Sequence, residues 1–365
     1  MAENMVSQGQ RSPGPDRFDG SRIAFHSLSR RLGRPWVEAY MERAAARART
    51  DPEARRALAE LSGARTLNFL VGPYGEGREN RGLLSWTPQG RPSPLAELPW
   101  PVEDPAENAR WVCELARRLG ALDAGVAPLE PEWVYGRVQT NPYAPGEPET
   151  KPIVIRPAAG PAETQDEFVL PETVNRAVVL LAPMDRRRLV SKRPFEASIE
   201  TNLGYSRMAE LAVSVAEALR AAGFTAIPCM NDTALSVPLA VAADLGAAGR
   251  HGMLAARGWG TAVRIAKVLT DMPLEPAEPP EEPLAGLCHD CGICARACPV
   301  GAIPEGEPTA EAPHPCNRPG SLKWPVDGEA CLRFWVERGE SCGLCQGVCP
   351  LQVSVDGRQA QRARG

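Results

Sequence analysis

The sequence has neither a strong net charge nor a long apolar stretch. Its 365 residues carry a formal net charge of −4, which is too small to favour nucleic acid or an anionic membrane as a partner. No apolar stretch approaches the roughly 20 residues of a membrane-spanning helix. Residues 29–32 resemble a twin-arginine signal, but the residues after them, to Arg49, are charged and alanine-rich. We therefore expect a soluble, cytoplasmic protein with no nucleic-acid or membrane partner.

The motifs of the common cofactors are absent as well. No Gly-x-Gly-x-x-Gly follows a strand and opens a helix, because the nearest approach, at Gly75 and Gly77, lacks the third glycine. There is no phosphate-binding P-loop. None of the four histidines stands in Asp-x-His-x-x-Gly, the motif that binds a corrinoid through a histidine below cobalt. The residues alone therefore identify neither a nucleotide nor a corrinoid cofactor.

Cysteine, by contrast, is plentiful and regularly spaced. Cys-x2-Cys-x2-Cys-x3-Cys-Pro begins at Cys288, and Cys-x2-Cys-x3-Cys-Pro begins at Cys342. Bacterial ferredoxins with two 4Fe–4S clusters have this arrangement, in which the cysteine before proline binds the other cluster. Zinc ribbons also use Cys-x2-Cys pairs, but zinc needs neither the third cysteine nor Cys-Pro after both runs. The sequence therefore predicts two 4Fe–4S clusters and transfer of single electrons.

The two clusters need eight thiolates. The two runs supply seven, so Cys331 is the candidate for the eighth. Three cysteines remain, Cys113, Cys229 and Cys316, and an odd remainder without a secretory signal indicates a reducing compartment. The predicted ligands of one cube are Cys288, Cys291, Cys294 and Cys349, and those of the other are Cys298, Cys331, Cys342 and Cys345.

Patterning divides the chain into three parts. Residues 1–105 form an N-terminal, partly flexible region, frayed up to about residue 25, with a helical pattern from 37 towards 61. Residues 106–275 alternate strands and helices, which predicts an α/β or α+β core. A proline-rich connector leads to the ferredoxin-like domain at 284–353. In the core we expect helices at 108–119, at 206–222 and from 237, strands at 153–155, 177–181 and 225–228, and a linker at 139–152.

Several stretches resemble the corrinoid-dependent reductive dehalogenases, in that family's order. The resemblance extends over about residues 106–352, and no single stretch carries it alone. The matching stretches are residues 109–121 and 132–135, Gly204-Tyr205 with the helix after them, Ser-Val-Pro-Leu-Ala at 236–240, Leu245-Gly246, Gly249-Arg250, Arg264 with Lys267, Thr-Asp-Met-Pro-Leu at 270–274, and Asn317, Gly320, Trp324, Cys331 and Trp335.

The resemblance implies a fold, a cofactor and an electron donor. The family's α/β core holds a corrinoid base-off, without a protein ligand to cobalt, and the missing histidine motif agrees with this. The chain lacks the flavin and ferredoxin reductase modules of some soluble members, so we expect a separate low-potential donor of the ferredoxin or flavodoxin type. The residues expected to line the corrinoid, in a segment that also suits an ordinary helix start, are Ser236, Val237, Pro238, Leu239 and Ala240.

The resemblance also implies three catalytic residues. Tyr205 matches the family's proton donor, Arg264 its neighbouring cation, and Asn231 a polar position between them. A cation beside a phenol favours its ionised form, which makes the proton easier to give. Taken without the resemblance, the same residues suit a packed tyrosine, a surface ion pair and a helix cap.

Three functions are therefore open. The leading hypothesis is reductive cleavage of a carbon–halogen bond in a small organohalide. A second is another reduction on the same scaffold, such as that of the epoxyqueuosine reductases, which share the corrinoid and both clusters but usually continue into a helical-repeat region that this sequence lacks. A third is an electron-transfer or corrinoid-binding protein without substrate chemistry. The sequence indicates neither the substrate nor the oligomeric state.

Overall fold

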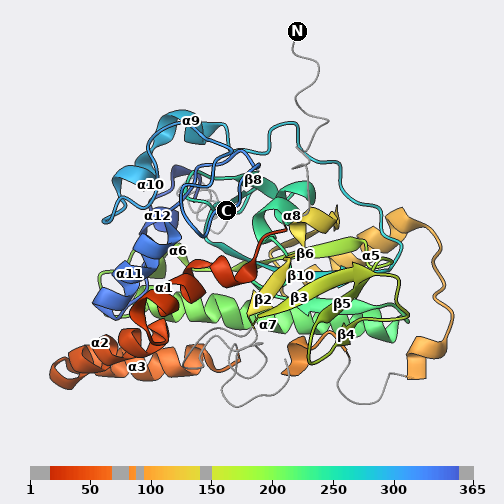
Figure 1. Cartoon of the computed structure of the whole chain (residues 1–365), viewed down its shortest axis with the longest axis horizontal. Helices are drawn as coiled ribbons and strands as arrows, with labels where there is room; N and C mark the ends of the chain where they lie inside the picture. The colour runs from red at the N-terminus through yellow and green to blue at the C-terminus, as the bar shows by residue number, and fades with distance from the viewer. Residues whose placement is uncertain (1–16, 68–81, 88–93, 140–149, 353–365) are drawn as a thin grey trace, which may run out of the picture.

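The chain folds into an α+β core flanked by N-terminal helices and a C-terminal helical segment (Figure 1). In Figure 1 the long helix α7, Glu196–Ala221, runs beneath the sheets, and the N-terminal helices lie beside the C-terminal ones. This computed structural model describes residues 17–67, 82–87, 94–139 and 150–352.

A four-stranded sheet in the order β1-β6-β10-β7 forms the centre of the core. Its strands are β1 Asp123–Pro128, β6 Arg176–Pro183, β10 Val263–Thr270 and β7 Ala226–Cys229, all paired antiparallel. The run at 177–181 lies within β6, whose inner residues are all buried, because both faces of the sheet are covered. The sheet is thus the scaffold on which two layers pack.

The two faces of the sheet carry different layers. Val178 and Leu180 pack with helix α7 and helix α5, Pro105–Arg118, whereas Val179 and Leu181 pack with α8, Ser236–Ala242. The α8 side also holds a second sheet. The remaining strands are β2 Arg137–Gln139, β3 Thr150–Arg156, β4 Ala162–Glu163, β5 Phe168–Pro171, β8 Gly246–Ala248 and β9 Leu254–Ala256.

The N-terminal and C-terminal helices pack on each other. A shared apolar cluster joins Leu28 and Tyr40 to Leu332 and Val336, and Arg47 forms an ion pair with Glu340 at 2.6 Å. The helices in this contact are α1 Ala24–Leu32, α2 Trp36–Thr50 and α11 Gly328–Arg338. The other helices, not yet named, are α3 Pro52–Ala64, α6 Arg186–Leu189, α9 Leu287–Cys291, α10 Ile293–Arg296, α12 Leu344–Gly347, η1 Gly20–Arg22, η2 Gly82–Leu84, η3 Pro94–Glu97 and η4 Pro131–Trp133.

The structure differs from the sequence-based expectations in four places. The helical pattern at 37–61 is two helices, because Asp51 caps α3 and Pro52 occupies its first turn. Helix α7 begins at Glu196, well before the expected residue 206. Its first turns bury the polar residues Ser198, Glu200 and Thr201, so the apolar pattern that would have predicted a buried helix is missing there. Residues 150–152 of the expected linker belong to β3. The fraying expected to about residue 25 is wrong from 17 onward, because Phe18 is buried against the Tyr135 ring.

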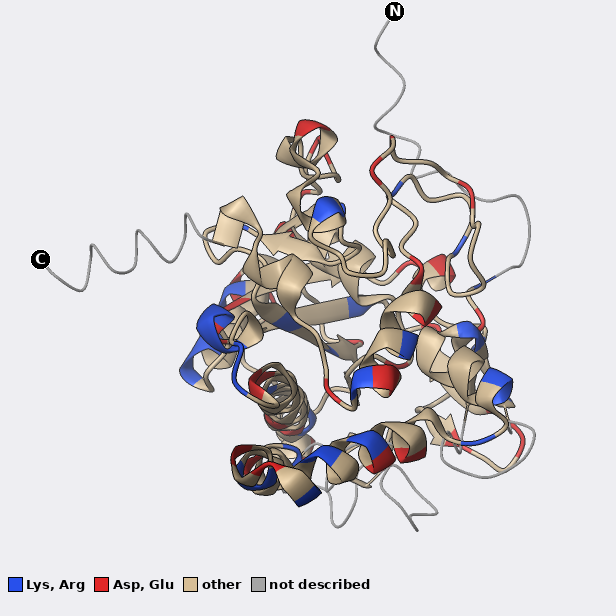
Figure 2. Ribbon diagram, turned by 90° about the vertical axis from the view of Figure 1, so that its left-hand side faces the viewer, with Lys and Arg blue, Asp and Glu red and all other residues tan. Residues whose placement is uncertain are grey.

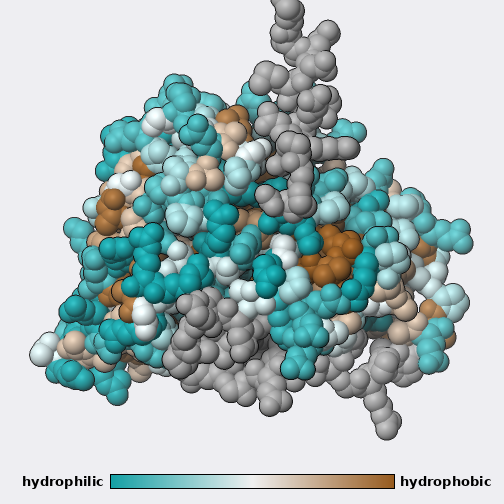
Figure 3. Space-filling view, viewed as in Figure 1, coloured by the Kyte–Doolittle hydropathy of each residue, from teal (hydrophilic) through white to brown (hydrophobic). Residues whose placement is uncertain are grey.

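Residues 1–16, 68–81, 88–93, 140–149 and 353–365 lie outside the described residues, and they include most of the expected linker. Figure 2 shows acidic and basic residues mixed along the described helices on the side where the N-terminal helices lie. Figure 3 shows a mainly polar face with scattered apolar patches. None of the described helices is long and apolar enough to cross a membrane.

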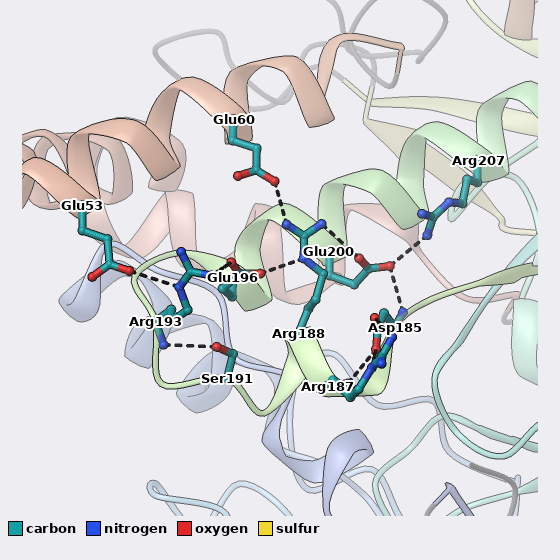
Figure 4. Close-up of polar contacts among 10 residues, drawn as sticks. All are labelled: Glu53, Glu60, Asp185, Arg187, Arg188, Ser191, Arg193, Glu196, Glu200 and Arg207. Carbon is teal, nitrogen blue, oxygen red and sulfur yellow. Dashed lines mark hydrogen bonds and ion pairs between the residues drawn. The ribbon is translucent and has the colours of Figure 1, made fainter. Parts of the chain in front are cut away.

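An ion-pair network fixes the start of α7 (Figure 4). The Glu200 side chain is 2% exposed and lies 2.8 Å from Arg207 and 3.7 Å from Arg188. One Glu200 oxygen also accepts a hydrogen bond from the Asp185 amide. Arg188 reaches Glu60 of α3 as well. The network therefore ties the N-terminal helices and the loop after β6 to α7.

Replacing Glu200 with Gln should lower the midpoint of thermal unfolding by a few degrees. The change leaves two guanidinium groups around a buried neutral amide, which costs roughly 1–3 kcal/mol. The matched control is Glu60→Gln, whose side chain is 55% exposed and whose loss should cost about 0–1 kcal/mol. Equal midpoints for the two variants would contradict the role of the network.

Candidate active site

A cavity of about 390 Å³ lies between the N-terminal helices and α7. Its core side is formed by Tyr205 of α7 and by Asn231 and Ser236 from the loop and helix start that follow β7. Phe25 and Trp36 face them from α1 and α2. The wall is largely apolar with a few polar groups, the usual composition of a small-molecule site.

Two of the predicted catalytic residues, Tyr205 and Asn231, line this cavity, and the third, Arg264, contacts Tyr205 from behind it. The Asn231 side-chain amide donates a hydrogen bond to the Tyr205 hydroxyl at 3.1 Å. The guanidinium carbon of Arg264 lies 4.6 Å from the centroid of the Tyr205 ring, within the range of a cation–π contact. The structure therefore brings all three residues together from α7, β10 and the loop between β7 and α8.

Gly204 makes room for this contact. A Cβ at Gly204 would stand 3.0 Å from Cγ of Arg264 and 3.1 Å from the Met184 side chain. A larger residue would push the arginine stem away from Tyr205. Gly204 thus leaves the space that the Arg264 side chain needs to reach the Tyr205 ring.

The segment predicted to line the corrinoid divides between the cavity and the core. Ser236 lines the cavity, and Val237 and Pro238 are half-buried. Leu239 and Ala240 are fully buried and belong to the apolar core on the α8 side. Within this segment only the first three residues are therefore able to meet a bound molecule.

The eight predicted cluster ligands form two groups of four. One space is lined by Cys288, Cys291, Cys294 and Cys349 of α9, α10 and the turn after α12. A second cavity, of about 210 Å³, is lined by Cys298, Cys331, Cys342 and Cys345. Among the described residues, no three His, Cys, Asp or Glu side chains converge closely enough to hold a single metal ion. None of the eleven cysteines, all within the described ranges, forms a disulfide.

The electrostatics of the thiols reflect the same grouping. Burial raises the pKa of the Cys294 thiol to about 11, and the negative charges of Cys288, Cys349 and Cys291 add to the effect. Burial, followed by Cys342 and Cys298 and then Asp327, raises the pKa of Cys331 to about 12. Neighbouring thiolates repel one another, so each group would favour a cationic cluster that neutralises them.

The Tyr205 cavity and the Cys298 cavity share a wall. Ala24, Phe25 and Trp335 line both, and Arg264 lines the second. Within the described residues, two buried donors at this boundary have no hydrogen-bond partner, Nε of Arg264 and Nε1 of Trp335. Unpaired buried donors are costly, so the boundary suits a bound molecule that carries hydrogen-bond acceptors. A corrinoid, whose rim bears amide groups, fits this requirement.

The N-terminal helices contribute three aromatic side chains to the cavity, which no sequence pattern predicted. Phe25, Trp36 and Tyr40 line it from helices for which no function was expected. Their signal in the sequence is only an aromatic side chain on an amphipathic helix, which is usual for core packing. Trp335 belonged to the resemblance pattern, but its place between the two cavities could not be inferred from spacing.

Comparisons with known proteins agree with this arrangement. A family model described as a 4Fe-4S dicluster domain matches residues 287–353. A tetrachloroethene reductive dehalogenase of Sulfurospirillum multivorans is 36% identical over 291 residues, which cover 76% of this chain and 58% of that protein. The chain is therefore a homologue of the reductive dehalogenases over about three quarters of its length. It spans about half the length of the curated relatives it matches.

Two further matches show how far the similarity extends. The structure of a catabolic reductive dehalogenase in complex with 3-bromo-4-hydroxybenzoic acid matches with a TM-score of 0.60, at 21% identity, over 92% of this chain and 42% of that chain. This likeness shows that the two share a fold. An epoxyqueuosine reductase of Bacillus subtilis is 28% identical over 129 residues, 31% of this chain and 28% of that protein. The two kinds of reductase are therefore related through part of this chain.

Changing Cys331 to Ala should remove or degrade one cluster and leave the other. Reconstituted protein should hold about eight irons, and this variant about four, because each cube needs four thiolates. The matched control is Cys316→Ala. Cys316 lines neither four-cysteine space, and its thiol donates a hydrogen bond to the Val326 carbonyl at 3.8 Å. Iron content and the cluster absorption of the two variants decide the point, and loss of iron from Cys316→Ala instead would overturn the ligand assignment.

Proposed function

We propose that this chain is a corrinoid-dependent reductive dehalogenase that cleaves a carbon–halogen bond of a small organohalide. The observation that carries the proposal is the Tyr205 cavity, in which a hydroxyl held by Asn231 lies across a shared wall from four grouped cysteines. The overall reaction consumes two electrons and one proton and releases halide. Electrons would enter through the clusters and the proton from the protein.

Tyr205 is the proposed proton donor. Its hydroxyl accepts a hydrogen bond from the Asn231 amide, so its own hydrogen is available to a substrate in the cavity. Arg264 contacts the ring and favours the negative charge that remains after the proton leaves. The bound corrinoid would supply a reduced cobalt centre, and we propose that it is held base-off, without a protein ligand. Ser236, Arg264 and Trp335 would hold it.

We propose that the electrons pass from the Cys288 group to the Cys298 group. The Cys298 cavity is the inner one, since Arg264 and Trp335 line it, and His251 lines both four-cysteine spaces. The Cys288 group lies in α9 and α10, where Leu287 is 50% exposed. A separate low-potential donor of the ferredoxin or flavodoxin type would meet the protein there.

Tyr205→Phe should retain both clusters and the corrinoid but lose turnover. The variant keeps the ring and its contact with Arg264 and removes only the hydroxyl, and general acid catalysis is typically worth ~10²–10⁴ in rate. Halide release from chlorinated and brominated aromatic and aliphatic compounds, under anaerobic conditions with a chemical reductant, is the measurement.

The matched control is Tyr40→Phe. The Tyr40 hydroxyl bonds Ser198 at 2.9 Å instead of Asn231, so its loss should reduce halide release far less. Normal turnover by Tyr205→Phe with its cofactors intact would remove Tyr205 as the donor. If the wild-type protein releases no halide from any of these compounds but reduces an epoxide, the chemistry belongs to the epoxyqueuosine reductase type instead.

A further inference from the structure

Lys267 is a fully buried lysine in the middle of the core. It lies on β10 and is 0% exposed, on the face of the sheet that packs against α8. Its ammonium donates hydrogen bonds to the carbonyls of Met230 and Ala234, the latter at 3.1 Å, and to the Ser236 hydroxyl at 2.7 Å. An ammonium has three N–H donors and a neutral amine has two, so three acceptors match the charged form.

The environment of this charge has opposing effects. Burial lowers the pKa of Lys267, and the nearby Cys229 and Asp232 act in the opposite direction. A buried charge without partners is unfavourable, and a fully hydrogen-bonded one loses much of its stabilisation when any partner is removed. The side chain is therefore strongly coupled to the segment that supplies all three acceptors.

That segment, residues 230–236, is the loop between β7 and α8 together with the first residue of α8, and it is called the 230–236 loop below. Its backbone is strained at one residue. Thr233 has a φ of +69° and is fully buried. A β-branched residue rarely adopts this conformation, which persists only where the surroundings hold it. Two backbone hydrogen bonds help: the Tyr135 amide donates to Thr233 at 2.8 Å, and the Leu235 amide donates to Trp133 at 2.9 Å.

The loop presents two residues of the candidate active site. Asn231 holds the Tyr205 hydroxyl, and Ser236, an acceptor of the Lys267 ammonium, lines the cavity. On the same strand β10, Arg264 points to the opposite face of the sheet and contacts the Tyr205 ring. One strand thus holds the ring of Tyr205 directly and its hydroxyl partner through the loop.

We propose that Lys267 is a positioning residue, whose buried ammonium holds the strained 230–236 loop so that Asn231 orients the Tyr205 hydroxyl and Ser236 faces the cavity. The catalytic consequence rests on the proposed function, whereas the control of the loop rests on the geometry alone. Lys267 itself touches neither the cavity nor the substrate.

The first test is hydrogen–deuterium exchange, read by mass spectrometry, on the reconstituted full-length protein. In Lys267→Met the amides of 230–236 should exchange roughly tenfold faster or more, the change expected when hydrogen bonds to a charged group are lost. The matched control is Thr270→Val, which removes a hydrogen bond to the Thr225 carbonyl from the same strand. It should leave exchange in the loop unchanged. Equal exchange in wild type and Lys267→Met would overturn the proposal.

The second test separates positioning from general stability by a double-mutant cycle on halide release. Lys267→Met should lower kcat by about 10²-fold, as misplaced catalytic groups do, with little change in KM. In the Asn231→Ala background the same change should cost at most a few-fold, because the residue through which it acts is gone. Additive losses in the double variant would show that Lys267 acts on the protein as a whole, and would contradict the proposal.

A third variant keeps the test possible if Lys267→Met cannot be obtained as folded protein. If Lys267→Met does not fold, Ser236→Ala removes a single acceptor and should still speed exchange across 230–236, whereas an unchanged loop would count against the proposal. The exchange measurement also separates this inference from the proposed function. Wild-type protein without dehalogenase activity would defeat the proposed function, while the exchange results would still decide whether Lys267 holds the loop.

Discussion

One buried guanidinium binds the start of the cluster segment to the core. Arg250 is 2% exposed and comes from the connection between β8 and β9. It donates to the carbonyls of Cys288, His289, Pro304 and Gly306 at 2.7–3.1 Å and lies 4.8 Å from the Trp324 ring centroid. Buried backbone carbonyls need hydrogen-bond donors, and the guanidinium supplies donors to four of them at once. The position of the Cys288 group relative to the core depends on this contact, and hydrogen bonds between Thr261 and Gln346 attach the other end of the cluster segment.

Strand β10 of the central sheet supplies two side chains that contact residues of the candidate active site. Alternate residues of β10 face opposite layers, so Arg264 faces α7 and Lys267 faces α8. Because both faces of the sheet are covered, these two cations are held in fixed places by packing as well as by hydrogen bonds. A shift of β10 by one residue would exchange the two faces of the strand. It would move Arg264 away from Tyr205 and Lys267 away from the 230–236 loop.

Much of the arrangement could be read from local patterns, and the rest depends on contacts between distant segments. Cysteine spacing predicted the dicluster domain, and the apolar run in β6 predicted a buried central strand. The early start of α7 escaped prediction, because buried Glu200 is paired with Arg188 and Arg207. Likewise, the sequence shows Lys267 only as part of a matching stretch, because its three acceptors lie more than 30 residues away. The contribution of the N-terminal helices to the cavity has no motif at all.

We propose that electrons held by the cluster domain reach a substrate in the Tyr205 cavity. The most direct measurement mixes fully reconstituted, pre-reduced protein, freed of excess reductant, with an organohalide, and follows cluster oxidation and halide release together. We expect the cluster signals to disappear as halide appears, with two electrons consumed for each halide released. Clusters that stay reduced while halide is released, or that are oxidised without any halide, would contradict it.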